Sequence, residues 1–435
     1  MSSELRRLWE QAGGKVPDDW KILPFESLFR DNKSIAVGVM YPGLDTPGGV
    51  PLLKVGDVKN GLVSVRPSYC ISAATNEEHK RTQLVGDELL ITLVGNPGEC
   101  IVATSAMAGW NPARAIAVVR LHDTSLRTYL KAVLESTPGK HLIDAVLNTT
   151  VQKTLNLKDV RQLPIPLPSR FVIEEISSIA NSLIQRIAVL RETNTTLEAI
   201  AQEMFKSWFV DFDPVHAKQQ GRAPEGMDEA TAALFPDSFE ESELGLVPIG
   251  WEVKSLGDLL VPKRGKSITK SKCIDGDIPV VAGGLEPAYF HNQGNVCSPV
   301  VTISASGANA GFVRLYQQDI WASDCSFVSA EQTDATFFWY AFLKFNQDKI
   351  YSMQQGAAQP HIYPSDLMRL SISSPKSCVM RNVFNGFVSP LFESIGLANS
   401  KIKTLASLRD TLLPRLISGQ LRLPEAEAVL EEATA

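Results

Sequence analysis

Two stretches of the chain carry apolar residues at spacings that alternate between three and four. Ten of the eleven positions in the first stretch are apolar, and nine of eleven in the second, 208 residues later. A seam kept this long is typical of a helix that packs on another helix. The sequence therefore predicts two long helices that form an antiparallel coiled coil. The alternative is two amphipathic helices, each lying on its own domain. The seam residues are Ile176, Leu183, Ile187, Leu190, Asn194, Leu197 and Met204 in the first helix and Leu391, Ile395, Ala398, Ile402, Leu405, Leu412 and Leu416 in the second.

Some residues of these helices break the apolar pattern or extend it. Asn194 lies in the first seam, where it either fixes the register of the pair or is tolerated at a partly exposed position. Pro390 and Pro414 are expected to kink or end the second helix. Four aromatic residues close the first helix and either anchor a partner or pack against the neighbouring module. They are Phe205, Trp208, Phe209 and Phe212.

The segments before the helices carry shorter patterns that indicate strands. A β-type run at 89–94 breaks into a Gly/Asn loop at 95–98, and a second run at 300–303 breaks into a similar loop at 304–311. A short apolar helix is expected at 336–345. Strands mixed with short helices predict an α+β fold class for both segments.

The chain repeats itself with a period of a whole domain. Val16 to Trp20 returns as Val247 to Trp251, 231 residues later, whereas the exit at 163–168 returns at 370–375, only 207 residues later. The interior of the second copy is therefore 24 residues shorter. A preserved frame with a divergent interior indicates two equivalent modules that recognise two different targets. The predicted organisation is a first module at 1–170, a helix at 171–210, an acidic Pro/Gly-rich connector at 211–245, a second module at 246–376, a second helix at 377–420 and a tail at 421–435.

Composition narrows the class of protein. The 435 residues are 44% hydrophobic and 21% charged, which is ordinary for a globular protein. The apolar runs are shorter than a membrane span and the first residues do not resemble a signal peptide, so we expect a soluble, cytoplasmic protein. The six cysteines are scattered without a C-x-x-C pair, which favours free thiols over disulfides or zinc. The net charge of −6 argues against binding to nucleic acid at first sight. Residues 211–250 hold nine acids against two bases, however, so the negative charge is concentrated in this one segment.

Candidate DNA contacts therefore depend on local clusters. Five bases lie within residues 263–272, a pattern suited to phosphates, although a solvated basic loop is an equal alternative. The first module is expected to have a weaker cluster in the corresponding place, at 30–34. Amide side chains in the Gly/Asn loops and at 354–361 could read bases, although turn chemistry explains the Gly and Asn residues equally well. The candidate residues are Arg30, Lys33, Ser34, Asn96, Lys263, Arg264, Lys266, Lys270, Lys272, Asn309 and Gln359.

The sequence lacks recognisable catalytic motifs. A phosphate-binding P-loop at 260–267 is rejected because Leu260 stands where glycine is required. The strings at 111–114 and 213–216 resemble the catalytic loop of an adenine methyltransferase, but both lack its second proline and its aromatic residue. We find no metal-binding, nucleophile-elbow or dinucleotide pattern. The chain is interpreted as a binder without catalytic, cofactor or metal residues of its own, and any chemistry must come from partners.

The order module, helix, module, helix resembles the DNA-specificity subunit of a type I restriction–modification enzyme. The resemblance covers nearly the whole chain and is carried by Trp20, Trp251, the Leu-Pro-Ile-Pro-Leu-Pro exit at 163–168, the helix end at 194–215 and the closing run at 412–419. It implies two target-recognition domains that each read half of a bipartite double-stranded DNA site. It also implies two methyltransferase subunits that methylate adenine N6 with S-adenosylmethionine, and motor–nuclease subunits that use ATP and Mg²⁺. No base-contacting residue transfers from the family, because the module interiors vary.

The predicted helices set a length scale for such a site. Residues 173–208 would span about 54 Å at ~1.5 Å per residue, more than one DNA turn of roughly 34–36 Å. We therefore expect two half-sites separated by an unread spacer, and an asymmetric target because the modules differ. The competing class is a DNA-binding regulator or scaffold that works without enzymatic partners.

Overall fold

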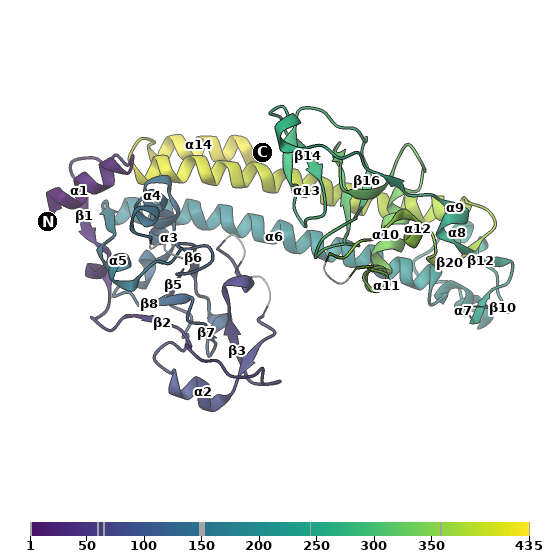
Figure 1. The fold of residues 1–435 in the computed structure, drawn as a ribbon, viewed down its shortest axis with the longest axis horizontal. Helices are drawn as coiled ribbons and strands as arrows, with labels where there is room; N and C mark the ends of the chain where they lie inside the picture. Colours follow the sequence, from purple (N-terminus) through teal and green to yellow (C-terminus); the bar gives the residue numbers. More distant parts are fainter. Residues whose placement is uncertain are drawn as a thin grey trace. The chain divides into compact units, whose positions relative to one another are not determined.

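The computed structural model describes residues 2–58, 61–63, 66–147, 153–243, 245–356 and 359–434. The chain forms two compact units (Figure 1). Unit 1 comprises residues 1–189 and 401–435, and unit 2 comprises residues 190–400. Each unit therefore holds one of the two modules together with a segment of each long helix.

The two predicted long helices are α6 (Arg170–Phe209, 40 residues) and α13 (Val379–Ile417, 39 residues). Within unit 2 they run antiparallel. Asn194 Nδ2 lies 2.9 Å from Asn399 Oδ1. Fourteen residues further along α6, the ring of Trp208 lies 5.5 Å from the ring of Phe384, which is fifteen residues nearer the start of α13 than Asn399. The predicted fold class, two α+β regions with two long helices packed together, is confirmed.

The two prolines of the second helix do not end it, so that part of the expectation is wrong. α13 continues through Pro390 and Pro414 to Ile417, where Gly419 follows with a φ of +67°. An interior proline costs a helix about 3 kcal/mol. Val388 and Phe392 are fully buried on either side of Pro390, and we attribute the continuity of the helix to this packing.

Unit 1 contains short strands, short helices and two helical ends. Its strands are β1 (Lys21–Pro24), β2 (Ile35–Val37), β3 (Val50–Leu53), β4 (Cys70–Ile71), β5 (Leu89–Thr92), β6 (Cys100–Val102), β7 (Asn111–Pro112), β8 (Ile116–Val119) and β9 (Pro164–Leu167). Its helices besides α6 and α13 are α1 (Ser2–Gln11), η1 (Phe25–Leu28), η2 (Val55–Asp57), α2 (Ala73–Glu78), η3 (Ser105–Met107), η4 (Thr124–Leu126), α3 (Arg127–Glu135), α4 (Thr137–Val146), α5 (Leu157–Gln162) and α14 (Leu423–Thr434).

Unit 2 has a similar set of elements. Its strands are β10 (Phe239–Ser242), β11 (Gly245–Pro248), β12 (Trp251–Ser255), β13 (Lys263–Arg264), β14 (Ile278–Val281), β15 (Tyr289–His291), β16 (Val300–Ser304), β17 (Val313–Tyr316), β18 (Trp321–Ala322), β19 (Cys325–Ser329) and β20 (Ser371–Pro375). Its helices besides α6 and α13 are α7 (Asp213–Gln219), α8 (Glu229–Ala233), α9 (Leu256–Leu259), η5 (Lys270–Lys272), α10 (Thr336–Phe345), α11 (Gln347–Ser352) and α12 (Pro364–Leu367).

The sheets of the two modules share one topology. In the first module the strand orders are β1-β9, β2-β8-β5-β6 and β4-β3-β7, and in the second β12-β20, β13-β19-β16-β17 and β15-β14-β18. The entry and exit strands pair in both modules, which places the repeated sequences side by side. The Gly residues that close the β5–β6 and β16–β17 turns are also equivalent, because Gly98 has a φ of +92° and Gly311 a φ of +90°. The sequence repeat is thus a repeat of the complete strand order.

The core of unit 2 is rich in aromatic side chains and includes the end of α6. Phe205 is 1% exposed and contacts the rings of Phe338 on α10 and Phe384 on α13. Trp208, Phe209 and Phe212 are buried in the same cluster. Of the two roles considered for these four residues, the structure supports packing against the neighbouring module.

The acidic connector is more ordered than its composition predicted. It contains the short helices α7 and α8 and the start of a β10–β11 hairpin. Val215 and Phe235 from this segment are buried in the core of unit 2, so it belongs to the packed structure of that unit. No helix in the described ranges is long and apolar enough to cross a membrane.

Candidate nucleic-acid interface

Three loops of the second module meet around Asp324. One Asp324 carboxylate oxygen lies 2.7 Å from Arg264 Nη2 on β13, and the other accepts a hydrogen bond from Ser306 Oγ in the loop after β16. That loop is joined in turn to the loop before α12, because Gly307 N donates to Pro360 O at 3.0 Å. The structure therefore brings together the three loops that contain the predicted residues Arg264, Asn309 and Gln359.

The chain after Arg264 is held by the neighbouring segment 321–325. Lys266 N donates to Ala322 O at 2.9 Å, and Trp321 Nε1 donates to Lys266 O at 2.8 Å. A side chain at Gly265 would bring its Cβ within 2.4 Å of Ser323 O, so glycine is needed for this close approach. The part of the basic loop next to Arg264 is thus well braced.

The four lysines predicted around Arg264 differ from it in their environment, because Arg264 has a carboxylate partner. Lys263, Lys266, Lys270 and Lys272 are all exposed. Within the described residues no acidic group lies within ion-pair distance of these four ammonium groups, so they remain available to phosphates. Lys270 and Lys272 lie in the separate turn η5.

The amide residues of the second module have mixed roles. The backbone carbonyl of Asn309 accepts from Phe312 N at 3.0 Å, and the residue is half-buried. Gln354 and Gln355 donate to Ala310 O at 2.8 Å and Asp366 Oδ1 at 3.0 Å, which fixes their side chains within the protein. Gln359 is exposed. Residues 357 and 358 of the same predicted string lie outside the described residues.

The predicted cluster of the first module is partly engaged in a turn. Ser34 is buried, and its hydroxyl donates to Asp31 Oδ1 at 2.9 Å. This hydrogen bond, together with one from Lys33 N, lowers the pKa of Asp31. Arg30 and Lys33 are exposed. Of the three residues, only the two bases present free surface.

The strand register gives a different correspondence between the modules from the one expected. Arg264 pairs with Ser326 on β19, and the equivalent pair on β2 and β8 is Val37 with Ala117. The first-module counterparts of Lys263 and Arg264 are therefore Ala36 and Val37, and the expected correspondence with 30–34 is wrong. The entry strands β1 and β12 are offset by 231 residues, but β2 and β13 by only 227. The four-residue difference lies in the loop that joins the entry strand to the next strand of each module.

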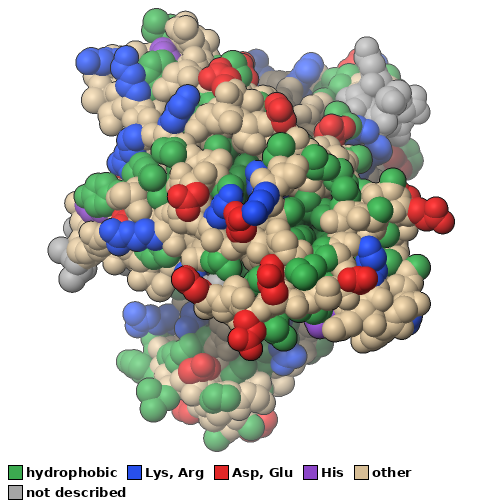
Figure 2. All heavy atoms as spheres, turned by 90° about the vertical axis from the view of Figure 1, so that its right-hand side faces the viewer, with side chains coloured by type: hydrophobic (Ala, Val, Ile, Leu, Met, Phe, Trp, Pro, Cys, Tyr) green, Lys and Arg blue, Asp and Glu red, His purple; other side chains and the backbone are tan. Residues whose placement is uncertain are grey.

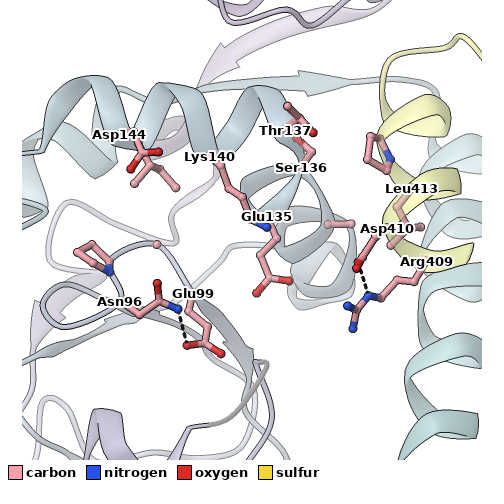
Figure 3. Close-up of a pocket in the computed structure, with 15 residues that line it drawn as sticks. Asn96, Glu99, Glu135, Ser136, Thr137, Lys140, Asp144, Arg409, Asp410 and Leu413 are labelled. Carbon is pink, nitrogen blue, oxygen red and sulfur yellow. Dashed lines mark hydrogen bonds and ion pairs between the residues drawn. The ribbon is translucent and has the colours of Figure 1, made fainter. Parts of the chain in front are cut away.

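Asn96 lies at the wall of a polar cavity in unit 1 (Figure 3). The cavity has a volume of about 510 Å³ and also borders α4 and the end of α13. Asn96 Nδ2 donates to Glu99 Oε2 at 3.2 Å. Glu135, Asp144 and Asp410 line the same cavity together with the bases Lys140 and Arg409, so the surroundings of Asn96 are of mixed charge and do not form a basic, phosphate-binding surface.

Sequence reasoning missed two residues at equivalent places in the modules. Asp324 stands between Ser323 and Cys325, and in the first module Arg114 and Ala115 fill the place between Ala113 and Ile116. The equivalence follows from hydrogen bonds, since Ser323 N donates to Val281 O and Ala113 N to Leu53 O, both at 2.8 Å. Arg114 is exposed. The repeat offset near Trp110 and Trp321 could have drawn attention to both residues.

The predicted seam residues differ in burial along the two helices. Every predicted seam position is buried or half-buried in its unit, with the least buried stretch between Leu190 and Leu197 on α6. Asn194 bonds to Asn399 through Nδ2, but its Oδ1 is buried without a hydrogen-bond partner among the described residues.

On the face drawn in Figure 2, Lys and Arg side chains are interspersed with Asp and Glu.

A family model and two relatives have the same family in common. The family model for the type I restriction modification DNA specificity domain matches residues 248–379, within and just beyond the second module. The MjaIX specificity subunit of Methanocaldococcus jannaschii is 26% identical over 288 residues, 61% of this chain and 62% of that protein. The HindI specificity subunit of Haemophilus influenzae is 26% identical over 357 residues, 67% of this chain and 74% of that protein. The first match thus spans less than two thirds of the relative's length.

A solved structure is similar over a longer stretch. The type I restriction–modification S subunit from M. genitalium has a TM-score of 0.49 and 18% identity, and the alignment covers 92% of this chain and 97% of that one.

Proposed function

We propose that the chain is a DNA specificity subunit of a type I restriction–modification system, which reads an asymmetric, bipartite DNA site and directs partner subunits to it. Each module reads one half-site, and an unread spacer separates the two. The observation that carries the proposal is the complete repetition of the strand order around different loop residues. Equivalent frames position equivalent loops, whereas different side chains on those loops select different bases.

The partners that supply the chemistry are two adenine-N6 methyltransferase subunits and, for cleavage of unmodified DNA, motor–nuclease subunits. S-adenosylmethionine, ATP and Mg²⁺ belong to these partners. Two apolar positions on the long helices support two equivalent docking sites. Val189 on α6 is 60% exposed and Leu397 on α13 is 68% exposed, and they lie 208 residues apart, which is the offset of the two seams. Exposed apolar side chains at matching places favour contact with two copies of one partner.

The proposal is tested by co-expressing the chain with its candidate methyltransferase subunit and mapping N6-methyladenine across the host genome. A single bipartite motif that disappears when this chain is omitted is the expected result. No new methylation despite a stable complex would contradict the directing role, and failure to form any complex would favour the stand-alone regulator or scaffold.

The docking positions are tested in the same assay. The double variant Val189→Asp and Leu397→Asp should abolish complex formation and methylation, because burying two carboxylates in an apolar contact is costly. Thr193→Asp, an exposed polar position on α6, is the matched control and should leave methylation intact. If the double variant still forms the complex, the partners dock elsewhere.

A further inference from the structure

We propose that Arg264 reads a guanine in the half-site of the second module and that Asp324 is the positioning residue that aims it. This inference rests on the proposed function and assigns one base of the target to one side chain. The chemistry is that of a forked donor, since a guanidinium matches the O6 and N7 acceptors of guanine in the major groove.

The first step is the difference between Arg264 and the other bases of its loop. Arg264 Nη2 is held by Asp324 at 2.7 Å, yet the Arg264 side chain remains 40% exposed. One nitrogen of the guanidinium is therefore fixed in the protein while the side chain as a whole stays partly accessible. The neighbouring Lys263 and Lys266 are exposed and, as point charges on flexible chains, are suited to phosphates.

The second step is the bracing of Asp324. Its second carboxylate oxygen accepts from Ser306 Oγ, and its backbone carbonyl accepts from Ala305 N at 3.2 Å. The adjacent Ser323 N donates to Val281 O at 2.8 Å, which fixes the start of the turn to β14. A carboxylate held on both sides restricts the rotamers of the arginine it binds, so less conformational entropy is lost when Arg264 meets a base.

The third step is electrostatic. A carboxylate beside a phosphate is repelled, so Asp324, which is 33% exposed, would weaken a purely phosphate-binding surface. Paired with Arg264 it forms a locally neutral unit with directed donors. Such a unit contributes little to counterion release but much to base selection. The geometry therefore fits groove recognition better than backbone contact.

The fourth step is the first module, where the pair is absent. Val37 occupies the place of Arg264, and Arg114 with Ala115 occupies that of Asp324. The inference therefore applies to the second half-site only.

The test uses the complex of the chain with its methyltransferase subunits and the motif found by methylation mapping. Duplexes in which each base pair of the second half-site is changed singly are titrated against the wild type and the variants Arg264→Ala, Arg264→Lys and Asp324→Asn. Arg264→Ala should lose about tenfold or more of the discrimination at one G·C pair and leave the other positions unchanged. Asp324→Asn and Arg264→Lys should reduce discrimination at the same pair.

Lys270→Ala is the matched control, because Lys270 is an exposed base in the turn η5 that follows in the sequence. It should weaken binding to every duplex alike and lower the slope of log K against log salt by about 0.9. A uniform weakening by Arg264→Ala would overturn the base assignment, and full discrimination in Asp324→Asn would overturn the positioning role. Absence of any motif in wild-type cells would instead indicate failure of the proposed function.

Discussion

The aromatic cluster at the end of α6 gives the sharpest stability prediction. Phe205 is 1% exposed, and five aromatic rings lie around it with centroids between 5.3 and 6.3 Å away. A Phe→Ala change in a well-packed core costs about 3–5 kcal/mol. Because rings on α6, α10 and α13 meet here, little collapse into the vacated space is expected. We therefore expect Phe205→Ala to lower the free energy of unfolding of unit 2 by about 3–5 kcal/mol.

The assay is urea unfolding of the whole chain followed by tryptophan fluorescence, since Trp208 and Trp251 report on the same cluster. With a slope of about 2–3 kcal/mol per molar urea, the midpoint for unit 2 should fall by about 1–2.5 M. Leu397→Ala, at a position 68% exposed in the same unit, is the control and should change stability by less than about 0.5 kcal/mol. A loss below about 1 kcal/mol for Phe205→Ala, or equal losses in both variants, would refute the packing argument.

Three further perturbations test the backbone, the seam and the buried thiols. Gly311→Ala should destabilise unit 2 by more than ~1 kcal/mol, because φ is +90° and the Cβ would meet Ile362 at 2.8 Å. Gly386→Ala lies inside α13 with open space around it and should instead stabilise the unit by about 0.5–1 kcal/mol. Thermal unfolding measures both changes. Asn194→Leu should raise the unfolding temperature, since it removes a buried, unpaired carbonyl oxygen, and an unchanged or lower value would assign Asn194 a net stabilising role. Burial raises the pKa of Cys325 from 9.0 to about 12. The stabilisation that the folded state gains by keeping this thiol protonated is therefore complete below pH 9 and is lost as the pH rises toward 12. Cys325→Ala should therefore show a shallower loss of stability over that window than the wild type.

Local patterns predicted the elements well. The seam on α6 and α13 follows from side-chain spacing within one helix, and the short helix expected at 336–345 is α10. The helix ends were harder to predict, because the continuity of α13 through Pro390 depends on packing contacts that spacing along one helix does not reveal. The connector illustrates the same limit, since Val215 and Phe235 take their place in the core from partners far along the chain.

The candidate site depended on contacts that sequence spacing does not encode. Arg264 and Asp324 are 60 residues apart, and their meeting requires the pairing of β13 with β19. The basic cluster itself was visible as a run of charges, but its counterpart in the first module was not, because a four-residue difference in one loop displaces the register. The run of charges therefore predicted where a DNA-binding surface could lie. The pairing of β13 with β19 determined which of its side chains has a carboxylate beside it.

The comparison of the two modules suggests why a repeated frame can serve two different half-sites. Positions that set backbone conformation are kept, as at Gly98 and Gly311, where the turn requires a positive φ and a side chain would strike Ile143 or Ile362. Other positions of the same frame differ in chemistry, as at the half-buried Val37 and the exposed Arg264. Because the loops are held by backbone hydrogen bonds, a change of outward side chain leaves the frame intact. Recognition of new bases can then arise without loss of stability, as the proposed asymmetric target requires.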